Sequence, residues 1–219
     1  MNQSFSLKSS HHLSLIPQSI VRYEGLEFGL SFEKGVRQLV ILAEKGEPRL
    51  ALFEGNQSDF EGGTLLLAPL SPANAGALRE LLPWLRPQVL GFQTSAGMGD
   101  RLGLATPGHV RATRRCKGKV APIFAQQSIR EMTRTGRTPQ QVMDDAMWGV
   151  FQENWQDGFG ADADHLKTEA DIDACLAAGY TFFTIDPGNF VNDQADHLNL
   201  EDLRNLAIDL PSALRMSEN

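Results

Sequence analysis

The feature of this 219-residue sequence that most restricts its fold is an alternation of strand-like and helix-like segments that starts near residue 87. Short strand-like segments occur at residues 88–92, 120–125, 161–166 and 181–186, and a loop and a helical pattern follow each of them. Strands that alternate with helices usually pair in parallel through right-handed crossovers. We therefore predict an α/β fold in this part of the chain, with four parallel strands joined by helices.

The helical segments carry recognisable start and stop signals. Pro107 and Pro139 stand at the first positions of two helices, where proline is favoured, and Gly179 follows another helix as a typical C-terminal cap. Asn199 is an N-cap residue for the last helix. These signals predict helices that start near residue 106 and span residues 139–156, 169–178 and 200–216.

The N-terminal part of the sequence has a different pattern. Residues 1–20 are polar, and we expect them to be loosely held. Between residues 21 and 68 the apolar residues recur with a period of about two, which indicates β-strands. Two β-rich runs, residues 38–43 and 49–53, flank a segment with the composition of a turn, so we predict that they form a hairpin.

A third strand is predicted at residues 64–68, followed by a helix over residues 71–85 that Pro83 should kink or shorten. The sequence thus divides into a β-rich cap with a helix, residues 1–86, and a partial (β/α) barrel, residues 87–219. An eight-stranded barrel of this kind usually takes about 250 residues, so four strand–helix units correspond to its first half. The predicted fold class is α/β, TIM-barrel-like, with a complete small open sheet as the alternative.

Composition and charge exclude several classes of protein. The net charge of −7 gives no overall attraction for phosphate groups, so nucleic acid is not an expected partner. No apolar run reaches membrane-spanning length, and the first residues lack the apolar core of a signal peptide. Cys116 and Cys175 form no Cys-x-x-Cys pair, which is typical of reduced thiols in a cytoplasmic protein. The basic cluster at residues 111–119 indicates the solvated end of a helix, with an anion site as the alternative.

The segment 160–168 places several ionisable residues at the end of a predicted strand. Such groups are costly to bury unless they reach a partner, a metal ion or solvent. In α/β folds the carboxyl ends of the strands are where ligands bind. Because neighbouring residues of a strand point to opposite faces, Asp164 and His165 can serve one site only where the strand ends or bends. An ordinary solvated loop is the alternative interpretation.

Polar residues follow the other predicted strands as well. Asp100 and Arg101 lie in a glycine-rich loop, where they would hold a hydroxyl and a carboxylate or form only a structural ion pair. The glycine spacing of this loop fits neither a dinucleotide fingerprint nor a P-loop. Because the carboxyl ends of parallel strands share one edge of a sheet, we predict a single site. Its members are Asp100, Arg101, Gln126, Arg130, Asp164, His165 and Asp186.

Four longer runs of sequence carry a resemblance. They are GDRLGLATPGH at residues 99–109, FAQQSIREMTRTGRTP at 124–139, WQDGFGADADHLK at 155–167 and FTIDPG at 183–188. These runs resemble the tagaturonate epimerases, a family of metal-dependent sugar-acid epimerases with a TIM-barrel-like fold. The resemblance covers residues 88–190 densely and the N-terminal part more loosely.

The resemblance implies the interconversion of D-tagaturonate and D-fructuronate, ketohexuronates that differ at C4, with a divalent metal cation of unspecified identity. Carried over by position, Asp164 is the acid–base residue and His165 is a metal ligand. Asp100, Arg101, Gln126, Arg130 and Asp186 are the candidates for substrate binding. Because C4 is β to the ketone, its proton is not acidic, so retro-aldol cleavage and re-closure is the expected route, with hydride transfer as the alternative.

The resemblance also places further metal ligands and a partner acid beyond the C-terminal end of this sequence. We therefore expect the 219-residue chain to be inactive or nearly so by itself and to bind metal weakly. A half-barrel would leave the strand at residues 181–186 with an unpaired edge, which favours self-association. The alternatives are a metal-dependent aldolase or isomerase of a sugar acid, and a truncated half-barrel chain without catalytic activity.

Overall fold

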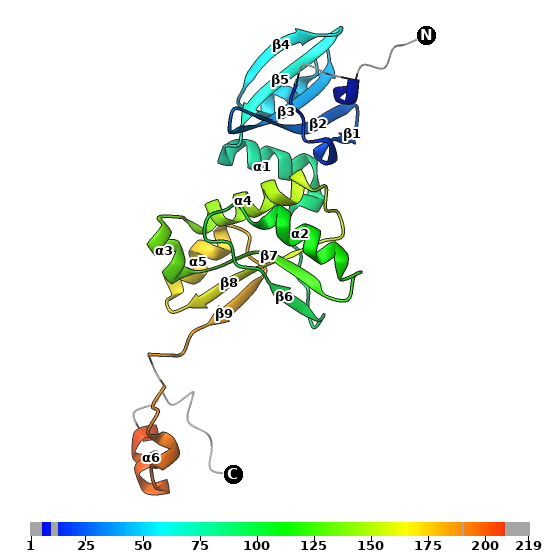
Figure 1. Ribbon diagram of the computed structural model, residues 1–219. Coiled ribbons are helices and arrows are strands. Elements are labelled where there is room, and N and C mark those ends of the chain that lie inside the picture. Colours follow the sequence, from blue (N-terminus) through cyan, green and yellow to red (C-terminus); the bar gives the residue numbers. More distant parts are fainter. Residues whose placement is uncertain (1–5, 10–12, 190, 209–219) are drawn as a thin grey trace. The chain divides into compact units, whose positions relative to one another are not determined.

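Two β-sheets dominate the computed structural model, which describes residues 6–9, 13–189 and 191–208. A five-stranded antiparallel sheet has the strand order β1-β2-β3-β5-β4, and a four-stranded parallel sheet has the order β6-β7-β8-β9 (Figure 1). The chain divides into two compact units, residues 1–185, which contain both sheets, and residues 186–219. The fold is therefore mixed α/β, with the parallel sheet that the sequence predicted and an antiparallel sheet before it.

The antiparallel sheet is built from hairpins, but the hairpin predicted for residues 38–43 and 49–53 is wrong. The first of these runs lies in β3, which pairs with β2 and β5, whereas Pro48–Leu52 forms a 3-10 helix. Pro48 has no N–H to offer a neighbouring strand, and the Glu47 side chain accepts the N–H of Arg49 at 3.1 Å, which favours a helical turn. The strands are β1 (Val21–Tyr23), β2 (Leu26–Glu33), β3 (Val36–Glu44), β4 (Asn56–Phe60) and β5 (Gly63–Pro69).

The described part of the N-terminal 20 residues is packed rather than loosely held. Leu7 is fully buried, and its backbone N–H donates to the carboxylate of Glu27 at 2.5 Å. The Ser6 hydroxyl donates to the same carboxylate at 3.0 Å. Two short 3-10 helices, Leu7–Ser9 and Pro17–Ser19, belong to this segment. The apolar residues among the polar ones therefore anchor the segment to β2.

Helix α1 (Pro72–Leu81) connects the antiparallel sheet to the rest of the chain. The Ser71 side chain caps its N-terminus by accepting the N–H of Asn74 at 3.2 Å. Pro83 begins a short 3-10 helix, Pro83–Leu85, so it ends α1 as predicted. Arg79 of α1 forms a 2.7 Å ion pair with Asp144, which ties α1 to a helix of the parallel sheet.

The parallel sheet has its four strands in sequence order, as the alternation of strands and helices predicted. Its strands are β6 (Ser95–Gly97), β7 (Ala121–Ser128), β8 (Gly160–Leu166) and β9 (Phe182–Ile185). The first strand, however, lies in the glycine-rich loop and not at residues 88–92. Gly91 has a positive φ of 57°, and the Phe92 side chain is fully exposed, so this apolar run makes a turn instead of a strand.

The helices of this region largely agree with the sequence signals. They are α2 (Thr106–Arg115), α3 (Ile129–Thr135), α4 (Pro139–Gln152), α5 (Glu169–Ala177) and α6 (Leu200–Ile208). Thr138 forms a capping box with Gln141 at the start of α4. Helix α3 was not predicted, and the predicted continuation of α6 beyond residue 208 lies outside the described residues.

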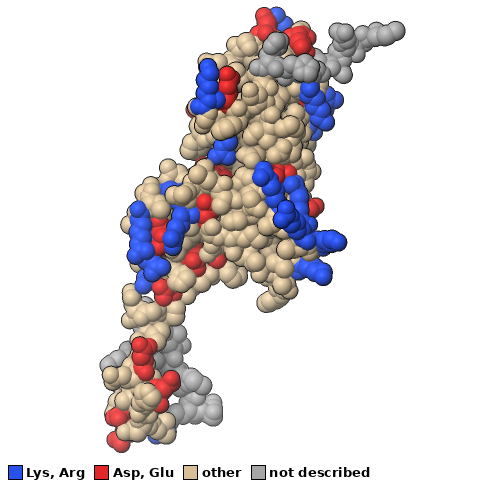
Figure 2. All heavy atoms as spheres, in the orientation of Figure 1, with Lys and Arg blue, Asp and Glu red and all other residues tan. Residues whose placement is uncertain are grey.

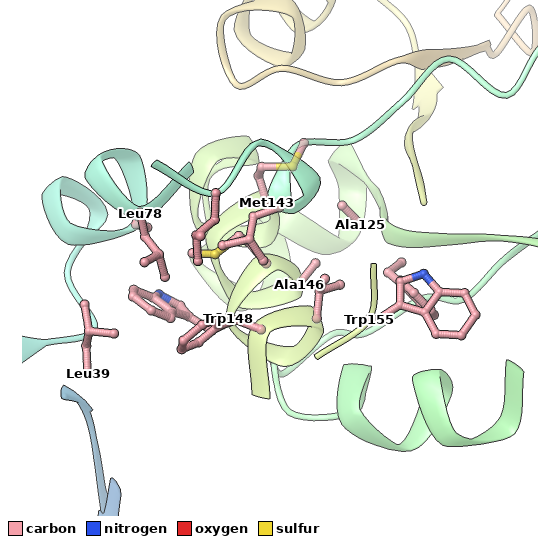
Figure 3. Packing of buried hydrophobic residues seen from close by; sticks show 14 of the residues in the cluster. Leu39, Leu78, Ala125, Met143, Ala146, Trp148 and Trp155 are labelled. Atoms are coloured by element: carbon pink, nitrogen blue, oxygen red, sulfur yellow. The ribbon is translucent and has the colours of Figure 1, made fainter. Parts of the chain in front are cut away.

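One hydrophobic cluster fills the space between the two sheets and their helices. Figure 3 shows Leu39 of β3 and Leu78 of α1 near Trp148 of α4, and Ala125 of β7 further along the same cluster. The methionine and aromatic residues of α4 are buried here. Because the core is continuous within residues 1–185, the two sheets are packed as one body, and the predicted division into domains at residue 86 stays a prediction.

Two further sequence features have a place in this fold. Both cysteines are free thiols: Cys116 is exposed at the end of α2, and Cys175 is buried in α5. Burial raises the pKa of the Cys175 thiol to about 11. None of the helices within residues 6–9, 13–189 and 191–208 has the length and apolar character that a membrane crossing requires.

Candidate functional site

A pocket of about 700 Å³ lies at the carboxyl ends of β6, β7 and β8. Side chains that follow each of these strands meet there, as expected for the carboxyl edge of a parallel sheet. Five of the seven predicted site residues line the pocket: Asp100, Arg101, Gln126, Arg130 and Asp164. The structure thus brings together residues that are up to 64 positions apart, between 100 and 164, in the sequence.

The carboxyl end of β8 is irregular at the two residues that the sequence singled out. The pairing of β8 with β9 shifts register between Ala163 and Leu166. His165 has a φ of 56°, a left-handed backbone conformation that non-glycine residues rarely adopt. Bulges of this kind re-aim side chains and are frequent beside functional sites. The strand therefore bends at Asp164 and His165, and this bend is the condition under which both side chains can belong to one site.

The bend places the two side chains in contact. His165 Nδ1 lies 2.6 Å from Asp164 Oδ1, a charge-assisted or neutral hydrogen bond depending on the protonation of the imidazole. If Nδ1 is the donor in this hydrogen bond, Nε2 of His165 keeps a free lone pair, and this atom would bind a metal ion or accept a proton. Asp164 is the more buried partner, with 17% of its side chain exposed against 61% for His165. Asp164 lines the pocket, and His165 contacts it through Asp164.

The side chain of Gln126 explains the glycines at the end of β6, Gly97 within the strand and Gly99 after it. A Cβ at Gly99 would lie 2.9 Å from Gln126 Oε1, and a Cβ at Gly97 would lie 3.2 Å from Gln126 Cγ. Any larger residue would push the Gln126 side chain out of its place. The glycines therefore leave space for the Gln126 side chain of β7 at the pocket, and this role is unrelated to nucleotide binding.

Asp100 uses its carboxylate to organise the loop that leads into α2. Its oxygens accept the backbone N–H of Leu102 at 3.1 Å and of Ala105 at 2.6 Å. Partial burial would raise the pKa of the Asp100 carboxyl, but backbone N–H donors outweigh this and lower it. Asp100 thus forms the turn, but the ion pair of Arg101 that the structure shows is with Glu131, and a substrate contact of Asp100 stays a prediction.

Glu131 is a residue of the pocket that the sequence analysis missed. It lies in the first turn of α3, only 8% exposed, and its carboxylate contacts three arginines. Oε2 is 2.9 Å from Arg101 Nε, and Oε1 is 2.6 Å from Arg134 Nη1 and 3.6 Å from Arg130 Nε. One sequence signal could have revealed Glu131. Ser128 is an N-cap residue shortly after a predicted strand, and a glutamate stands three positions after it, which is the pattern of a helix start. Figure 2 shows basic and acidic side chains interspersed on the α3 side of the molecule.

Two other candidate carboxylates do not line this pocket. Asp162, in β8, accepts the hydroxyl of Thr184 at 3.0 Å. Burial raises the pKa of the Asp162 carboxyl, although the Thr184 hydrogen bond opposes the shift. Asp186 directly follows β9, and its Oδ1 accepts the N–H of Gly188 at 2.8 Å. Asp186 belongs to the second unit, so the pocket is described without it.

The donors present do not complete a metal site. Within the described residues, no group of three or more His, Cys, Asp or Glu side chains is close enough to hold a metal ion. A protein site for a transition metal usually needs at least three such ligands. His165 could supply one ligand, with Asp164 orienting its ring, but the described residues do not fit a complete first shell around it.

A second pocket of about 660 Å³ lies at the amino ends of the strands, on the opposite edge of the parallel sheet. The basic turn after α2 contributes Lys117 and Lys119 to its lining, and Arg114 and Trp155 are also part of it. Figure 2 shows basic side chains gathered over α2 and this turn. Arg114 is held by the carbonyl of Glu153 and stacks over the Trp155 ring at 5.8 Å, so it has structural partners. The basic cluster thus forms a helix end, as interpreted from the sequence.

Comparisons with known proteins agree with one another. The family model for tagaturonate epimerase matches residues 16–218. The tagaturonate/fructuronate epimerase of Thermotoga maritima is 44% identical over 170 residues, which are 78% of this chain and 34% of that protein. This chain therefore spans about a third of the length of that relative.

Solved structures of the fructuronate-tagaturonate epimerase of Cohnella laeviribosi are similar as well. The native crystal structure is 35% identical, with a TM-score of 0.80 over 94% of this chain and 41% of that one. The two-glycerol complex of the same enzyme gives a TM-score of 0.81 at 35% identity, over 95% of this chain and 41% of that one. The match runs through both sheets and almost the whole sequence. The chain belongs to the tagaturonate epimerase family.

Proposed function

We propose that this chain takes part in the interconversion of tagaturonate and fructuronate, the activity named for its relatives. The observation that carries the proposal is the Asp164–His165 pair, held on the bent end of β8 at the pocket. We also propose that the curled parallel sheet is the first half of a (β/α) barrel, whose carboxyl ends would surround a ketohexuronate.

The chemistry at C4 restricts the role of Asp164. The C4 proton of a ketohexuronate is not next to the ketone, so its direct removal would leave an unstabilised carbanion. The Asp164 carboxylate would instead accept the proton of the C4 hydroxyl, and the C3–C4 bond would break to give an aldehyde and an enediolate. Re-closure on the other face of the aldehyde, with return of the proton from Asp164, gives the epimer.

The His165 contact suits this role of Asp164. Asp164 Oδ1 is engaged by the imidazole, which fixes the carboxylate and leaves Oδ2 for the substrate hydroxyl. His165 would be a ligand of a divalent metal cation, and such an ion, when bound, stabilises an enediolate as a Lewis acid. The described residues hold fewer than the three ligands that such a site usually needs, so His165 alone would not retain the ion.

The test uses the 219-residue chain and a chimera in which this chain replaces the matching part of the Thermotoga maritima relative. Epimerisation of tagaturonate is followed by carbon-13 NMR with and without added divalent metal. We expect activity in the chimera, and a loss of about 100-fold or more in Asp164→Asn, since general acid–base groups contribute that much. Asp157→Asn, on the opposite edge of the sheet, is the control.

Tagaturonate labelled with deuterium at C4 tests the route. Retro-aldol cleavage never breaks the C4–H bond, so the label should stay in the product. Exchange of the label with water would show direct proton abstraction and contradict the proposed role of Asp164. A chimera that folds but has no epimerase activity under any metal condition would contradict the proposed function itself.

A further inference from the structure

We propose that Glu131 with Arg101, Arg130 and Arg134 forms a subsite that binds the carboxylate of a hexuronate. The contacts are the guanidinium groups of Arg101 and Arg130, which line the pocket, whereas Glu131 and its partner Arg134 are positioning residues. The proposal rests on the proposed function, because it names the part of the substrate that this side of the pocket recognises. It adds two residues, Glu131 and Arg134, that the sequence did not suggest.

The balance of charge points to an anion. A buried carboxylate needs a cation or hydrogen-bond donors, and one arginine would meet that need for Glu131. Three guanidinium groups surround it instead, at 2.6, 2.9 and 3.6 Å, so the cluster carries two positive charges in excess. In the described part of the chain, Glu131 is the one carboxylate that contacts Arg101 or Arg130. An incoming carboxylate would balance half of this excess.

The geometry leaves donors for that carboxylate. Arg101 and Arg130 each contact the Glu131 carboxylate through Nε, and each guanidinium carries further N–H donors on its Nη atoms. The side chains of Arg101 and Arg130 are 67% and 73% exposed, whereas that of Glu131 is 11% exposed. Guanidinium groups bind carboxylates through paired N–H donors, and a buried anchor lowers the entropy lost when they do so. Glu131 therefore orders the arginines from beneath while they face the pocket.

A second, independent observation lies on the same pocket. Gln127 lines it and is 96% buried, with 4% of its surface exposed. Its Nε2 is buried and has no hydrogen-bond partner among the described residues. A buried amide donor without an acceptor is destabilising, and native proteins usually satisfy such groups with a ligand or water. An oxygen of the bound sugar acid would supply the acceptor.

The subsite predicts a preference that can be measured on the chain as it is. Tagaturonate and tagatose differ in that tagatose has a neutral hydroxymethyl group in place of the carboxylate. Hydrogen bonds to charged groups change binding by about 10-fold or more, so tagaturonate should bind at least 10-fold more tightly than tagatose. Isothermal titration calorimetry of the 219-residue chain with each sugar measures this ratio.

Arginine variants test whether Arg101 and Arg130 cause the preference for tagaturonate over tagatose. Arg101→Gln and Arg130→Gln should each weaken tagaturonate binding about 10-fold and leave tagatose binding unchanged. Arg115→Gln, an exposed arginine of α2 remote from the pocket lining, is the matched control and should change neither. Equal affinity for the two sugars, absence of tagaturonate binding, or unchanged binding in the Arg101 and Arg130 variants would each overturn the proposal.

Glu131→Gln separates positioning from simple attraction. Removing the buried negative charge raises the positive charge of the pocket, so long-range attraction alone would strengthen tagaturonate binding. If Glu131 positions the arginines, binding should instead weaken about 10-fold even though the charge is more favourable. Arg134→Lys keeps the positive charge but loses the guanidinium geometry beside Glu131, so it should weaken binding in the same direction and serves if Glu131→Gln does not fold. Stronger binding in Glu131→Gln would overturn the positioning role.

Failure of the carboxylate subsite and failure of the proposed epimerase function would give different results. If the chimera with both Arg101→Gln and Arg130→Gln epimerises tagaturonate with unchanged KM, the function stands and the subsite is wrong. If tagaturonate binds through these arginines but no chimera epimerises it, the subsite stands and the function is wrong.

Discussion

Glu27 in the antiparallel sheet and Glu131 in α3, the helix that follows strand β7 of the parallel sheet, are both buried, and their surroundings differ. Glu27 of the antiparallel sheet is 5% exposed and accepts from Ser6 Oγ, the Leu7 N–H and Arg22 Nε. Glu131 of α3 is 8% exposed, contacts three arginines and lines a pocket. Burial of a carboxylate alone therefore does not indicate a functional site. The proposed subsite rests instead on an excess of positive charge around Glu131 beside a pocket.

The core substitutions should have the largest effect on both regions. Phe28→Ala in the antiparallel sheet and Phe124→Ala in the parallel sheet each remove a buried ring, 6.3 Å from Phe53 and 5.9 Å from Trp155 respectively. We expect each to lower the free energy of unfolding by about 3–5 kcal/mol. Because one core joins the sheets, urea unfolding followed by circular dichroism should show a single transition. Two separate transitions would show that the sheets are independent.

Glycine substitutions should have the next largest effect. Gly103 has a φ of 70°, and a Cβ there would lie 2.3 Å from Asp145 Oδ2. Gly118 has a similar φ of 73° with nothing within 4 Å of its Cβ position. Gly118→Ala should cost about 1 kcal/mol from backbone strain, and Gly103→Ala clearly more, since Asp145 must also move. Equal losses in thermal or urea unfolding would show that the Asp145 contact is not what requires glycine.

Removing a charge should act in opposite directions in the two sheets. Burial raises the pKa of Asp162, so its contribution to stability is present below its unfolded-state pKa and is lost as pH rises through its folded-state pKa. Asp162→Asn should therefore stabilise the chain at pH 7, by no more than about 1 kcal/mol, and change little in acid. Glu27→Gln should destabilise it by about 1–3 kcal/mol at pH 7. Urea unfolding at pH 3 and pH 7 measures both.

Substitutions at the β9 edge of the parallel sheet should have the smallest effect on stability. β9 is the last strand of its sheet, and its Phe182 and Ile185 are 54% and 57% exposed. Phe182→Lys with Ile185→Lys should change the free energy of unfolding by about 0.5 kcal/mol or less but reduce self-association. Val36→Lys, at a 59% exposed position of the antiparallel sheet, is the control. Sedimentation velocity that shows the same association in all three proteins would contradict a role of the β9 edge.

The sequence predicted those elements whose signals are local. Strands β7 and β9 contain apolar runs, β8 begins at a glycine and ends before the N-cap Thr168, and α4 has both a capping box and an apolar face. β6 was missed because Ser95, Ala96 and Gly97 have little strand propensity and are held by neighbours, such as the hydrogen bond from Ala121 N to Thr94 O at 2.8 Å. The leucines at residues 50 and 52 suggested a strand, but Pro48 next to them makes a helical turn.

The site was predicted in part for the same reason. Asp164 and His165 are neighbours in the sequence, so the density of charge in this segment is apparent from the order of the residues alone. The bend that joins them depends on the register of β8 against β9, which no local pattern contains. Glu131 was missed because its importance comes from Arg101, 30 positions earlier, which the fold brings to 2.9 Å.

The central claim is that the carboxyl edge of the parallel sheet binds a ketohexuronate, and amide chemical shifts measured during a titration with tagaturonate test it most directly. We predict that shifts concentrate in residues 99–105, 126–131 and 163–167, with the five-stranded sheet unchanged. Shifts confined to the antiparallel sheet, or to the second pocket around Lys117 and Lys119 at the opposite edge, would contradict it.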